Sequence, residues 1–401
     1  MTDILSNKIN RIKPSLTVSI NIKANAMRAE GKDVLVLAAG EPDFDTPKNI
    51  QNAGINAIKN GDTRYVPGKG TKNLQEAIIN KFKRDNELIY EKDEITVAVG
   101  GKNIIYNAFM ATINEGDEVI IPAPFWVSYP DITLLADGKP IIVKCDEEND
   151  FKITPDQLEK NITDKTKWLM LNSPSNPTGS TYTFSELKEI ASVLIKFPNV
   201  LILTDDIYEK IIYENNKFYT LAQVEPKLKN RILTLNGVSK AYCMTGWRLG
   251  YAGGPKNIIA AMNKIQSQST TSTSSITMAA SVEALNGNQD FIIAHNVEFK
   301  KRRDMVVKNL NLAKGISCSL PSGAFYVYPN CQGCLGKKTE KGKIINSDED
   351  FMNYLLETEG IAGVHGEAFG MSPYFRISYA ASYEILEDAC KRIINACEKL
   401  I

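Results

Sequence analysis

A lysine in a loop between two apolar segments is the first candidate for chemistry in this sequence. Residues 232–235 and 249–252 are apolar and predict buried strands, and Lys240 lies in the polar, glycine-containing segment between them. Burial lowers the pKa of a lysine amino group, and a neutral amine can attack a carbonyl carbon to form a Schiff base. Most lysines are solvated at a protein surface. This segment alone therefore fits either a reactive lysine or an ordinary surface loop.

Carboxylates and an amide follow two other predicted strands. Asp205 and Asp206 come directly after an apolar segment, and Tyr208 follows them. Carboxylates at the end of a buried strand are costly unless a cation lies near them. The alternative is a solvated strand end. Asn176 lies in the proline-containing segment 172–179, where it could hydrogen-bond a ring substituent or only stabilise a turn.

Three further positions carry groups that recognise anions or planar rings. Gly100, Gly101 and Lys102 end a predicted strand and begin a helix, which indicates either an anion site or a simple turn. Trp126 follows another strand and could stack on a planar ligand or belong to the core. Arg376 lies in a late strand, and arginine is the natural bidentate partner of a carboxylate. A surface ion pair is the alternative for Arg376.

These candidates follow the strands of a repeating α/β pattern. Between about residues 70 and 255, apolar strands alternate with amphipathic helices, which predicts a mainly parallel sheet with helices on both faces. Ligands in such sheets bind at the carboxyl ends of the strands. Thr154 and Thr183 each begin a capping box at a helix start. The expected strands are 94–99, 118–121, 140–144, 167–171 and 200–204, and the helices are 102–113, 127–136, 154–161 and 183–197.

The two ends of the chain follow another pattern. Near the N-terminus we expect an arm and a helix (1–30), a short strand (34–38), a turn-rich link (40–47) and a helix (47–60). Long helical patterns run from residue 255 to about 312. They are followed by strands at 324–328 and 374–378 and helices at 348–357 and 383–400. This change from α/β to α+β places a domain boundary near residues 290–315.

Composition argues against several classes of protein. The 401 residues contain equal numbers of basic and acidic side chains, so no basic excess indicates nucleic acid binding. No apolar stretch predicts a membrane span or a signal peptide, and we expect a cytoplasmic protein. Cys331 and Cys334 form one C-x-x-C without a second pair, and we expect no metal site. Dinucleotide and P-loop glycine motifs are absent, which argues against a nicotinamide dehydrogenase.

Together the candidates supply an amine, a carboxylate, a phenol, an aromatic plate, an anion site and a carboxylate-binding arginine. That set suits pyridoxal 5'-phosphate with an amino acid. The sequence resembles the class I pyridoxal-phosphate aminotransferases of fold type I, especially bacterial aspartate aminotransferases of the aspartate/prephenate subgroup. The matching segments are 13–17 (Lys-Pro-Ser-Leu-Thr), 39–47 (Ala-Gly-Glu-Pro-Asp-Phe-Asp-Thr-Pro), Tyr65, 100–102, 126–130 (Trp-Val-Ser-Tyr-Pro), 172–179, 205–208, 239–248, 322–326 (Ser-Gly-Ala-Phe-Tyr) and 376–380 (Arg-Ile-Ser-Tyr-Ala).

The resemblance implies a role for each matching residue. Lys240 would carry the Schiff base and transfer the proton during catalysis, and Asp205, rather than Asp206, would pair with the pyridinium nitrogen. The other implied cofactor contacts are Tyr208 and Asn176 at the ring 3-oxygen, Trp126 on the ring face, and Gly101, Lys102, Arg248 and the partner subunit's Tyr65 at the phosphate. Arg376 would bind the substrate α-carboxylate, with Asn176, Trp126 and Gly40 beside it.

The implied reaction converts L-aspartate and 2-oxoglutarate to oxaloacetate and L-glutamate, with prephenate as a second acceptor that gives L-arogenate. Animal-type aspartate enzymes hold the side-chain carboxylate with an arginine, but residues 267–275 contain only serine, threonine and glutamine. The subgroup implies Lys102, Ser15, Thr17 and Lys13 instead. Without that arginine, an aminotransferase for aromatic or neutral amino acids is the alternative. A non-catalytic ligand-sensing protein on the same scaffold is a more distant one.

The resemblance also implies a homodimer with shared active sites and a seven-stranded sheet in the larger domain. The expected divisions are an arm (1–15), a small domain (16–46 and 300–401) and a large cofactor-binding domain (47–299).

Overall fold

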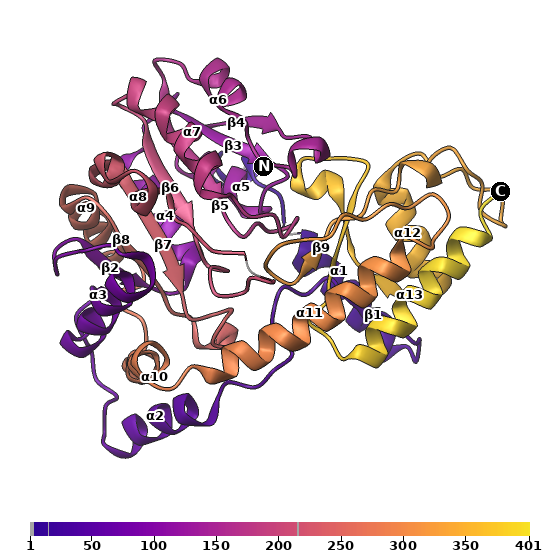
Figure 1. Cartoon of the computed structure of the whole chain (residues 1–401). Coiled ribbons are helices and arrows are strands. Elements are labelled where there is room, and N and C mark those ends of the chain that lie inside the picture. The colour runs from indigo at the N-terminus through magenta and orange to yellow at the C-terminus, as the bar shows by residue number, and fades with distance from the viewer. Residues whose placement is uncertain (1–3, 15, 215) are drawn as a thin grey trace.

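A seven-stranded sheet forms the centre of the molecule (Figure 1). The computed structural model describes residues 4–14, 16–214 and 216–401. The strands are β2 (Ile95–Ala98), β3 (Glu118–Ala123), β4 (Lys139–Lys144), β5 (Thr166–Asn172), β6 (Leu201–Asp205), β7 (Ile232–Gly237) and β8 (Gly250–Gly253). Their order is β2-β8-β7-β6-β5-β3-β4, and only the two pairings of β8 are antiparallel. The predicted mainly parallel sheet is confirmed.

Helices cover both faces of this sheet. They are α3 (Lys72–Asn86), α4 (Gly101–Thr112), α5 (Ser128–Leu135), α6 (Pro155–Asn161), α7 (Phe184–Lys196), α8 (Leu221–Val224), α9 (Lys256–Ser267) and α10 (Ser275–Asn286), and α2 (Lys48–Lys59) packs on α10. Side chains alternate along a strand, so Trp168 and Met170 of β5 join the core formed with α4, α5 and α9. Leu169 and Leu171 join the core on the opposite face, with α3, α7 and α10. Burial on both faces explains the nearly continuous apolar runs of the strands.

Local sequence signals set several helix boundaries. Both predicted capping boxes are present, with Thr154 and Gln157 at the start of α6 and Thr183 and Glu186 at the start of α7. Helix α3 was not among the predicted elements, although its buried apolar residues recur at helical spacing.

The C-terminal region (residues 311–401) lies beside the large sheet and is reached by the long helix α11 (Asp290–Leu310) (Figure 1). Its elements, with the N-terminal ones that pack on it, are α1 (Leu16–Ala29), β1 (Leu35–Val36), β9 (Tyr326–Val327), α12 (Asp348–Glu359), β10 (Ile361–Ala362), β11 (Val364–His365), β12 (Phe375–Ser378) and α13 (Tyr383–Glu398). Strand β1 pairs with β10, and β11, β12 and β9 form an antiparallel sheet. Strands β1 and β9 are shorter than predicted because their ladders extend over only two residue pairs.

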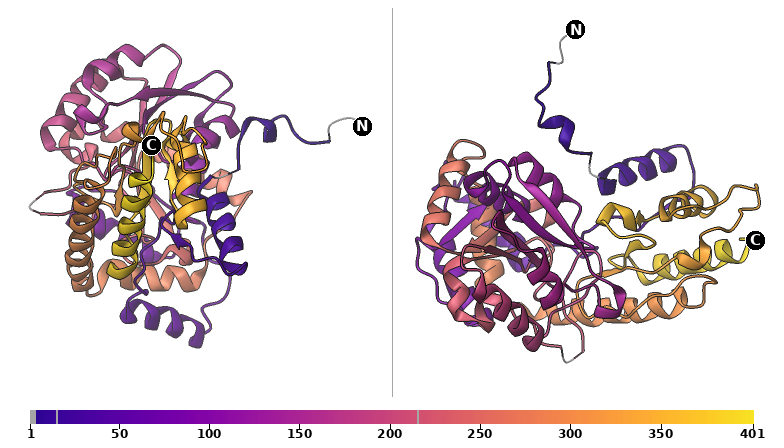
Figure 2. Two further views of the ribbon diagram at one scale, coloured as in Figure 1. Left: turned by 90° about the vertical axis from the view of Figure 1, so that its right-hand side faces the viewer. Right: turned by 90° about the horizontal axis from the view of Figure 1, so that it is seen from above.

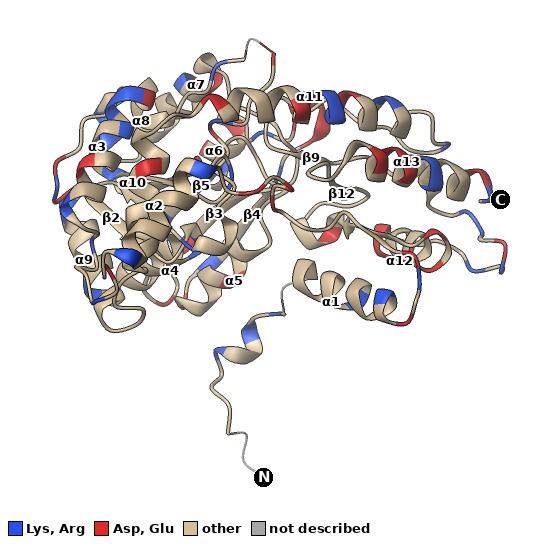
Figure 3. Ribbon diagram, turned by 90° about the horizontal axis from the view of Figure 1, so that it is seen from below, with Lys and Arg blue, Asp and Glu red and all other residues tan. Residues whose placement is uncertain are grey.

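Residues 4–14 project from the body of the molecule (Figure 2). They contact the end of α5, where Lys8 and Arg11 pair with Asp137 at N–O distances of 2.5 and 2.7 Å. Short 3-10 helices complete the structure at η1 (Ile9–Arg11), η2 (Glu147–Asn149), η3 (Pro226–Arg231), η4 (Thr245–Trp247), η5 (Gln332–Cys334) and η6 (Gly366–Phe369). Basic and acidic side chains are mixed along α11 and α13 (Figure 3). In the described part of the chain, no helix is long and apolar enough to cross a membrane.

Candidate active site

A cavity of about 310 Å³ lies at the carboxyl ends of β2, β3, β5, β6 and β7, a size found in small-molecule sites. Strands β9 and β12, the start of α1 and the segment at Gly40 close it from the other side. The predicted residues that line this cavity are Thr17, Gly40, Gly101, Lys102, Trp126, Asn176, Asp205, Tyr208, Lys240, Arg248 and Arg376. The fold therefore brings together residues that are up to several hundred positions apart in the sequence.

Lys240 lies in the turn after β7, with its amino group inside the cavity wall. Its Nζ donates a hydrogen bond to the carbonyl oxygen of Gly40 at 2.6 Å and lies 5.8 Å from the centre of the Tyr208 ring. Burial, followed by the positive charges of Arg376 and Arg248, lowers the pKa of Lys240 from 10.5 to about 8. A substantial fraction of this amine is therefore neutral near physiological pH, as a nucleophile requires.

Asp205 ends β6 and presents its carboxylate to the cavity. The Tyr129 hydroxyl donates to Asp205 Oδ2 at 2.7 Å, and the backbone N–H of Ile207 donates to Oδ1 at 3.3 Å. Burial raises the pKa of Asp205 to about 6, although both hydrogen bonds favour its charged form. A cation bound in the cavity would favour the carboxylate further. Asp206 is also buried but does not line the cavity.

Arg376 is a buried cation, and among the described residues its hydrogen bonds go to an amide and a backbone carbonyl, not to a carboxylate. Its Nη1 donates to Asn176 Oδ1 at 2.7 Å, its Nη2 donates to the carbonyl oxygen of Ala38 at 2.6 Å, and its buried Nε has no hydrogen-bond partner in the structure. A surface ion pair was the wrong alternative, because Arg376 is only 2% exposed. A buried, incompletely paired guanidinium is suited to binding a carboxylate that enters the cavity.

Cationic groups gather at the opposite end of the cavity. Helix α4 begins at Gly101 directly after β2, so its first backbone N–H groups face this end. The Lys102 ammonium lies 4.9 Å from the centre of the Trp126 ring, and burial and then the charge of Arg248 lower the pKa of Lys102. Gly100 has φ of 84°, and a Cβ there would lie 2.3 Å from Arg248 Nη2. Arg248 therefore packs directly against Gly100. The Arg248 guanidinium, the Lys102 ammonium and the first N–H groups of α4 together form a site suited to an anion.

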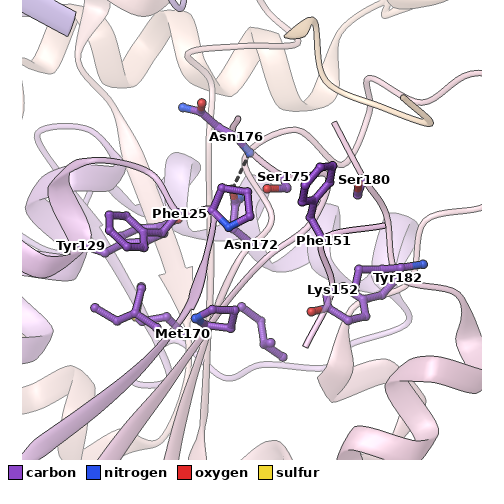
Figure 4. Close-up of a pocket in the computed structure, with 14 residues that line it drawn as sticks. Phe125, Tyr129, Phe151, Lys152, Met170, Asn172, Ser175, Asn176, Ser180 and Tyr182 are labelled. Atoms are coloured by element: carbon purple, nitrogen blue, oxygen red, sulfur yellow. Dashed lines mark hydrogen bonds between the residues drawn. The ribbon is translucent and has the colours of Figure 1, made fainter. Parts of the chain in front are cut away.

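A smaller cavity of about 30 Å³ lies behind the loop after β5, with room for one or two water molecules (Figure 4). Figure 4 shows the backbone N–H of Asn176 donating to Asn172 Oδ1, at 2.8 Å. The Asn172 Nδ2 in turn donates to the carbonyl oxygen of Asp205 at 2.7 Å. Asn172 therefore connects Asn176 to Asp205 through two hydrogen bonds. The sequence motif includes Asn172 but does not indicate this role.

Tyr65 and Lys13, two further predicted site residues, do not line the cavity of this chain. Tyr65 is 95% exposed, and Lys13 is exposed, with its backbone N–H bonded to the carboxylate of Asp131 in α5. Ser15 lies outside the described residues. Within the described ranges, no group of His, Cys, Asp or Glu side chains could hold a metal ion.

A family model described as aminotransferase class I and II matches residues 32–393. The chain belongs to the class I and II aminotransferases. It is 55% identical over 393 residues to a protein of Rhizobium leguminosarum bv. phaseoli named probable aspartate/prephenate aminotransferase, covering 98% of each chain. The crystal structure of an aspartate aminotransferase from Rhizobium meliloti superposes with a TM-score of 0.97, at 51% identity over 99% of each chain. An aspartate aminotransferase from Thermus thermophilus solved with maleate gives a TM-score of 0.91, at 37% identity over 98% of this chain and 99% of that one.

Aminotransferases of this class use pyridoxal 5'-phosphate, and the cavity fits that cofactor. An amine of lowered pKa suits its aldehyde, the Asp205 carboxylate suits its ring nitrogen, and the cationic end suits its phosphate. The orphaned Nε of Arg376 leaves a separate position for an amino acid carboxylate. Four features of the cavity therefore match four groups of the cofactor and its substrate: the aldehyde, the ring nitrogen, the phosphate and the amino acid carboxylate.

Capture of pyridoxal phosphate by the apo-aminotransferase is expected to accelerate as the pH rises through about 8. The reason is that only the neutral Lys240 amine attacks the aldehyde, so the rate should fall about tenfold per unit below this pH and level off above it. The growth of the visible absorption band after mixing measures this rate. A rate that kept rising from pH 8 up to the ordinary lysine pKa of 10.5 would show that the amine is not perturbed as its surroundings indicate.

Proposed function

We propose that this aminotransferase transfers the amino group of L-aspartate to 2-oxoglutarate, giving oxaloacetate and L-glutamate. Prephenate is proposed as a second acceptor, giving L-arogenate with aspartate or glutamate as the donor. The similarity to a relative named for both aspartate and prephenate, over 98% of each chain, carries this assignment. Bound pyridoxal phosphate supplies the chemistry, since it accepts the amino group from one acid, withdraws electrons from the reacting carbon and gives the amino group to the other acid.

Each residue around the cofactor would have a separate role. Lys240 would bind the cofactor covalently and, once released by the substrate, would move a proton at the substrate Cα. The Asp205 carboxylate, held by Tyr129, would keep the ring nitrogen protonated. The amide oxygen of Asn176 faces Arg376, which leaves its Nδ2 to donate to the ring 3-oxygen together with the Tyr208 hydroxyl. Trp126 would cover the ring.

The two carboxylates of aspartate would meet different parts of the cavity. Arg376 would bind the α-carboxylate, with the backbone at Gly40 beside it. Lys102 and the Thr17 hydroxyl both line the cavity and would meet the side-chain carboxylate. Lys13 lies near Asp131, so the N-terminal segment would have to shift for Lys13 to reach the substrate. Ser15 is proposed to assist, as in the subgroup that the sequence resembles.

A second copy of the chain would complete the site. A surface cavity of about 720 Å³ opens beside Arg248 and is lined by Ser272, Thr273 and Ser274. The partner subunit's Tyr65 would enter this opening and reach the phosphate. Ile4 is 93% exposed, and other apolar side chains of the arm and α1 are also exposed, as at a surface that a partner covers.

We also propose the division into an arm (1–15), a small domain (16–46 and 300–401) and a large domain (47–299). Pairing of β1 with β10 supports grouping the N-terminal segment with the C-terminal region. Gly40 and Arg376 would then move together and close over the substrate. The seven unpaired cysteines fit a reducing cytoplasm, where we propose that the protein acts.

The test of the substrate is a comparison of kcat/KM for aspartate, glutamate, alanine and tyrosine, with 2-oxoglutarate and with prephenate as acceptors. One charge-assisted contact to the second carboxylate should favour aspartate over alanine by roughly 10- to 150-fold. Lys102→Met removes the charge but keeps the side-chain stem, so it should lower the value for aspartate more than the value for alanine. Faster reaction with tyrosine or alanine than with aspartate would instead support the aromatic or neutral alternative.

A further inference from the structure

Tyr326 contacts both the substrate-binding and the cofactor-binding parts of the cavity. It lies in β9, is completely buried and lines the cavity. The Arg376 guanidinium lies 4.6 Å from the centre of its ring, and its hydroxyl lies 2.8 Å from the Tyr208 hydroxyl. We propose that Tyr326 is a positioning residue that orients the Arg376 guanidinium with its ring and the Tyr208 hydroxyl with its own hydroxyl. This assignment rests on the proposed function.

The ring of Tyr326 would fix the plane of the guanidinium. Arg376 donates two hydrogen bonds in the structure, one from each Nη atom. These two bonds alone would let the guanidinium plane rotate about the line through the two Nη atoms. The ring of Tyr326, together with that of Phe369 at 5.0 Å, restricts this tilt by cation–π contact. The orientation of this plane matters because bidentate binding of a carboxylate depends on the planar guanidinium of arginine.

The hydroxyl of Tyr326 would set the direction in which Tyr208 donates. Each phenol carries one hydrogen, and Tyr208 is the only hydrogen-bond partner that the described structure gives the Tyr326 hydroxyl. If Tyr208 donates its hydrogen to the cofactor 3-oxygen, the hydrogen between the two phenols must come from Tyr326. A phenol that accepts a hydrogen bond becomes a stronger donor. Tyr326 would therefore strengthen the contact that stabilises negative charge on the 3-oxygen.

Packing at Gly40 fixes the Tyr326 hydroxyl in this place. A Cβ at Gly40 would lie 2.7 Å from that hydroxyl oxygen, so only glycine leaves it room. The carbonyl oxygen of Gly40 also accepts the hydrogen bond from Lys240 Nζ at 2.6 Å. The same short backbone segment therefore contacts Tyr326 and the proposed covalent lysine.

Two substitutions in the holoenzyme separate the ring from the hydroxyl. Tyr326→Phe keeps the ring, so the dissociation constant of maleate, a dicarboxylate probe measured by calorimetry, should change by less than about twofold. The pH midpoint of the visible absorption band should rise by about half a unit, since the 3-oxygen loses part of its stabilisation. Tyr326→Leu removes both contacts, so it should also raise the maleate dissociation constant roughly tenfold.

A matched control removes a similar phenol elsewhere. The buried Tyr379 hydroxyl donates to the Tyr213 hydroxyl at 3.2 Å and does not line the cavity, so Tyr379→Phe should leave the band midpoint and maleate binding unchanged. If Tyr326→Phe leaves the midpoint in place, or weakens maleate binding as much as Tyr326→Leu does, the assignment is wrong. A wild-type protein without a visible band or without amino-group transfer would refute the proposed function itself, and this assignment with it.

Discussion

Lys240→Ala should reduce amino-group transfer by at least about 10,000-fold, because it removes the amine that we propose binds the cofactor and moves the proton at the substrate carbon. The fold should be retained. Burial lowers the pKa of Lys240 from 10.5 to about 8. The buried lysine therefore lowers the free energy of unfolding of the apo-protein. This effect is complete below about pH 8 and is lost as the pH rises to 10.5. At neutral pH the alanine variant should therefore unfold at the same temperature as the wild type or higher.

Steady-state rates with aspartate and 2-oxoglutarate, together with thermal unfolding of the apo-proteins, check this expectation. Lys83→Ala is a suitable control, since Lys83 is an exposed lysine at the end of α3 and should be dispensable. Near wild-type turnover by the Lys240 variant would remove Lys240 from the mechanism. Loss of turnover together with a large fall in the unfolding temperature would show a structural role instead.

Arg376→Ala should lower kcat/KM for aspartate by roughly 1,000-fold while leaving cofactor retention nearly unchanged. Removing one partner of a buried charge pair costs about 2–5 kcal/mol, and every 1.4 kcal/mol is about tenfold. The cofactor should be retained because the carboxylate of Asp205 and the cations at Lys102 and Arg248 lie on other walls of the cavity. Kinetics and dialysis against cofactor-free buffer measure the two quantities.

The conservative variant Arg376→Lys distinguishes charge from geometry. Lysine keeps the charge but lacks the planar fork that reaches Asn176 and Ala38, so it should recover only part of the lost kcat/KM. An unchanged kcat/KM in Arg376→Ala would exclude Arg376 from the substrate site. Equal loss of substrate use and of cofactor retention would point to collapse of the cavity.

The sequence could predict the residues that follow apolar strands, and it missed those whose role arises from tertiary contact. Asp205 ends a strand buried on both faces and Asn176 lies in the loop after another, so their type and position already made them candidates for contact with a ligand. Tyr129 donates a hydrogen bond to Asp205 from helix α5, and that pairing is invisible in the chain order. Tyr326 belonged to a recognised segment, but its contacts with Arg376 and Tyr208 appear only in the folded chain.

The fold could be predicted where a strand carries a long apolar pattern, and less well where a strand is short. Strands of the large sheet carry long apolar runs because helices cover both of their faces, and these strands were found. Strands β1 and β9 pair over only two residues each, which gives too little periodicity to set their ends. Tyr65 and Lys13 were chosen by resemblance alone, and neither lines the cavity of the single chain.

Lys240 is the residue that we propose binds pyridoxal phosphate covalently. Reduction of the holoprotein with borohydride, followed by digestion and mass spectrometry of the peptides, tests this most directly. We expect the cofactor mass on the peptide that contains Lys240, and we expect that adding aspartate before reduction removes it from that peptide. Cofactor on another lysine, such as Lys102, or on no peptide at all would exclude Lys240 as the covalent site.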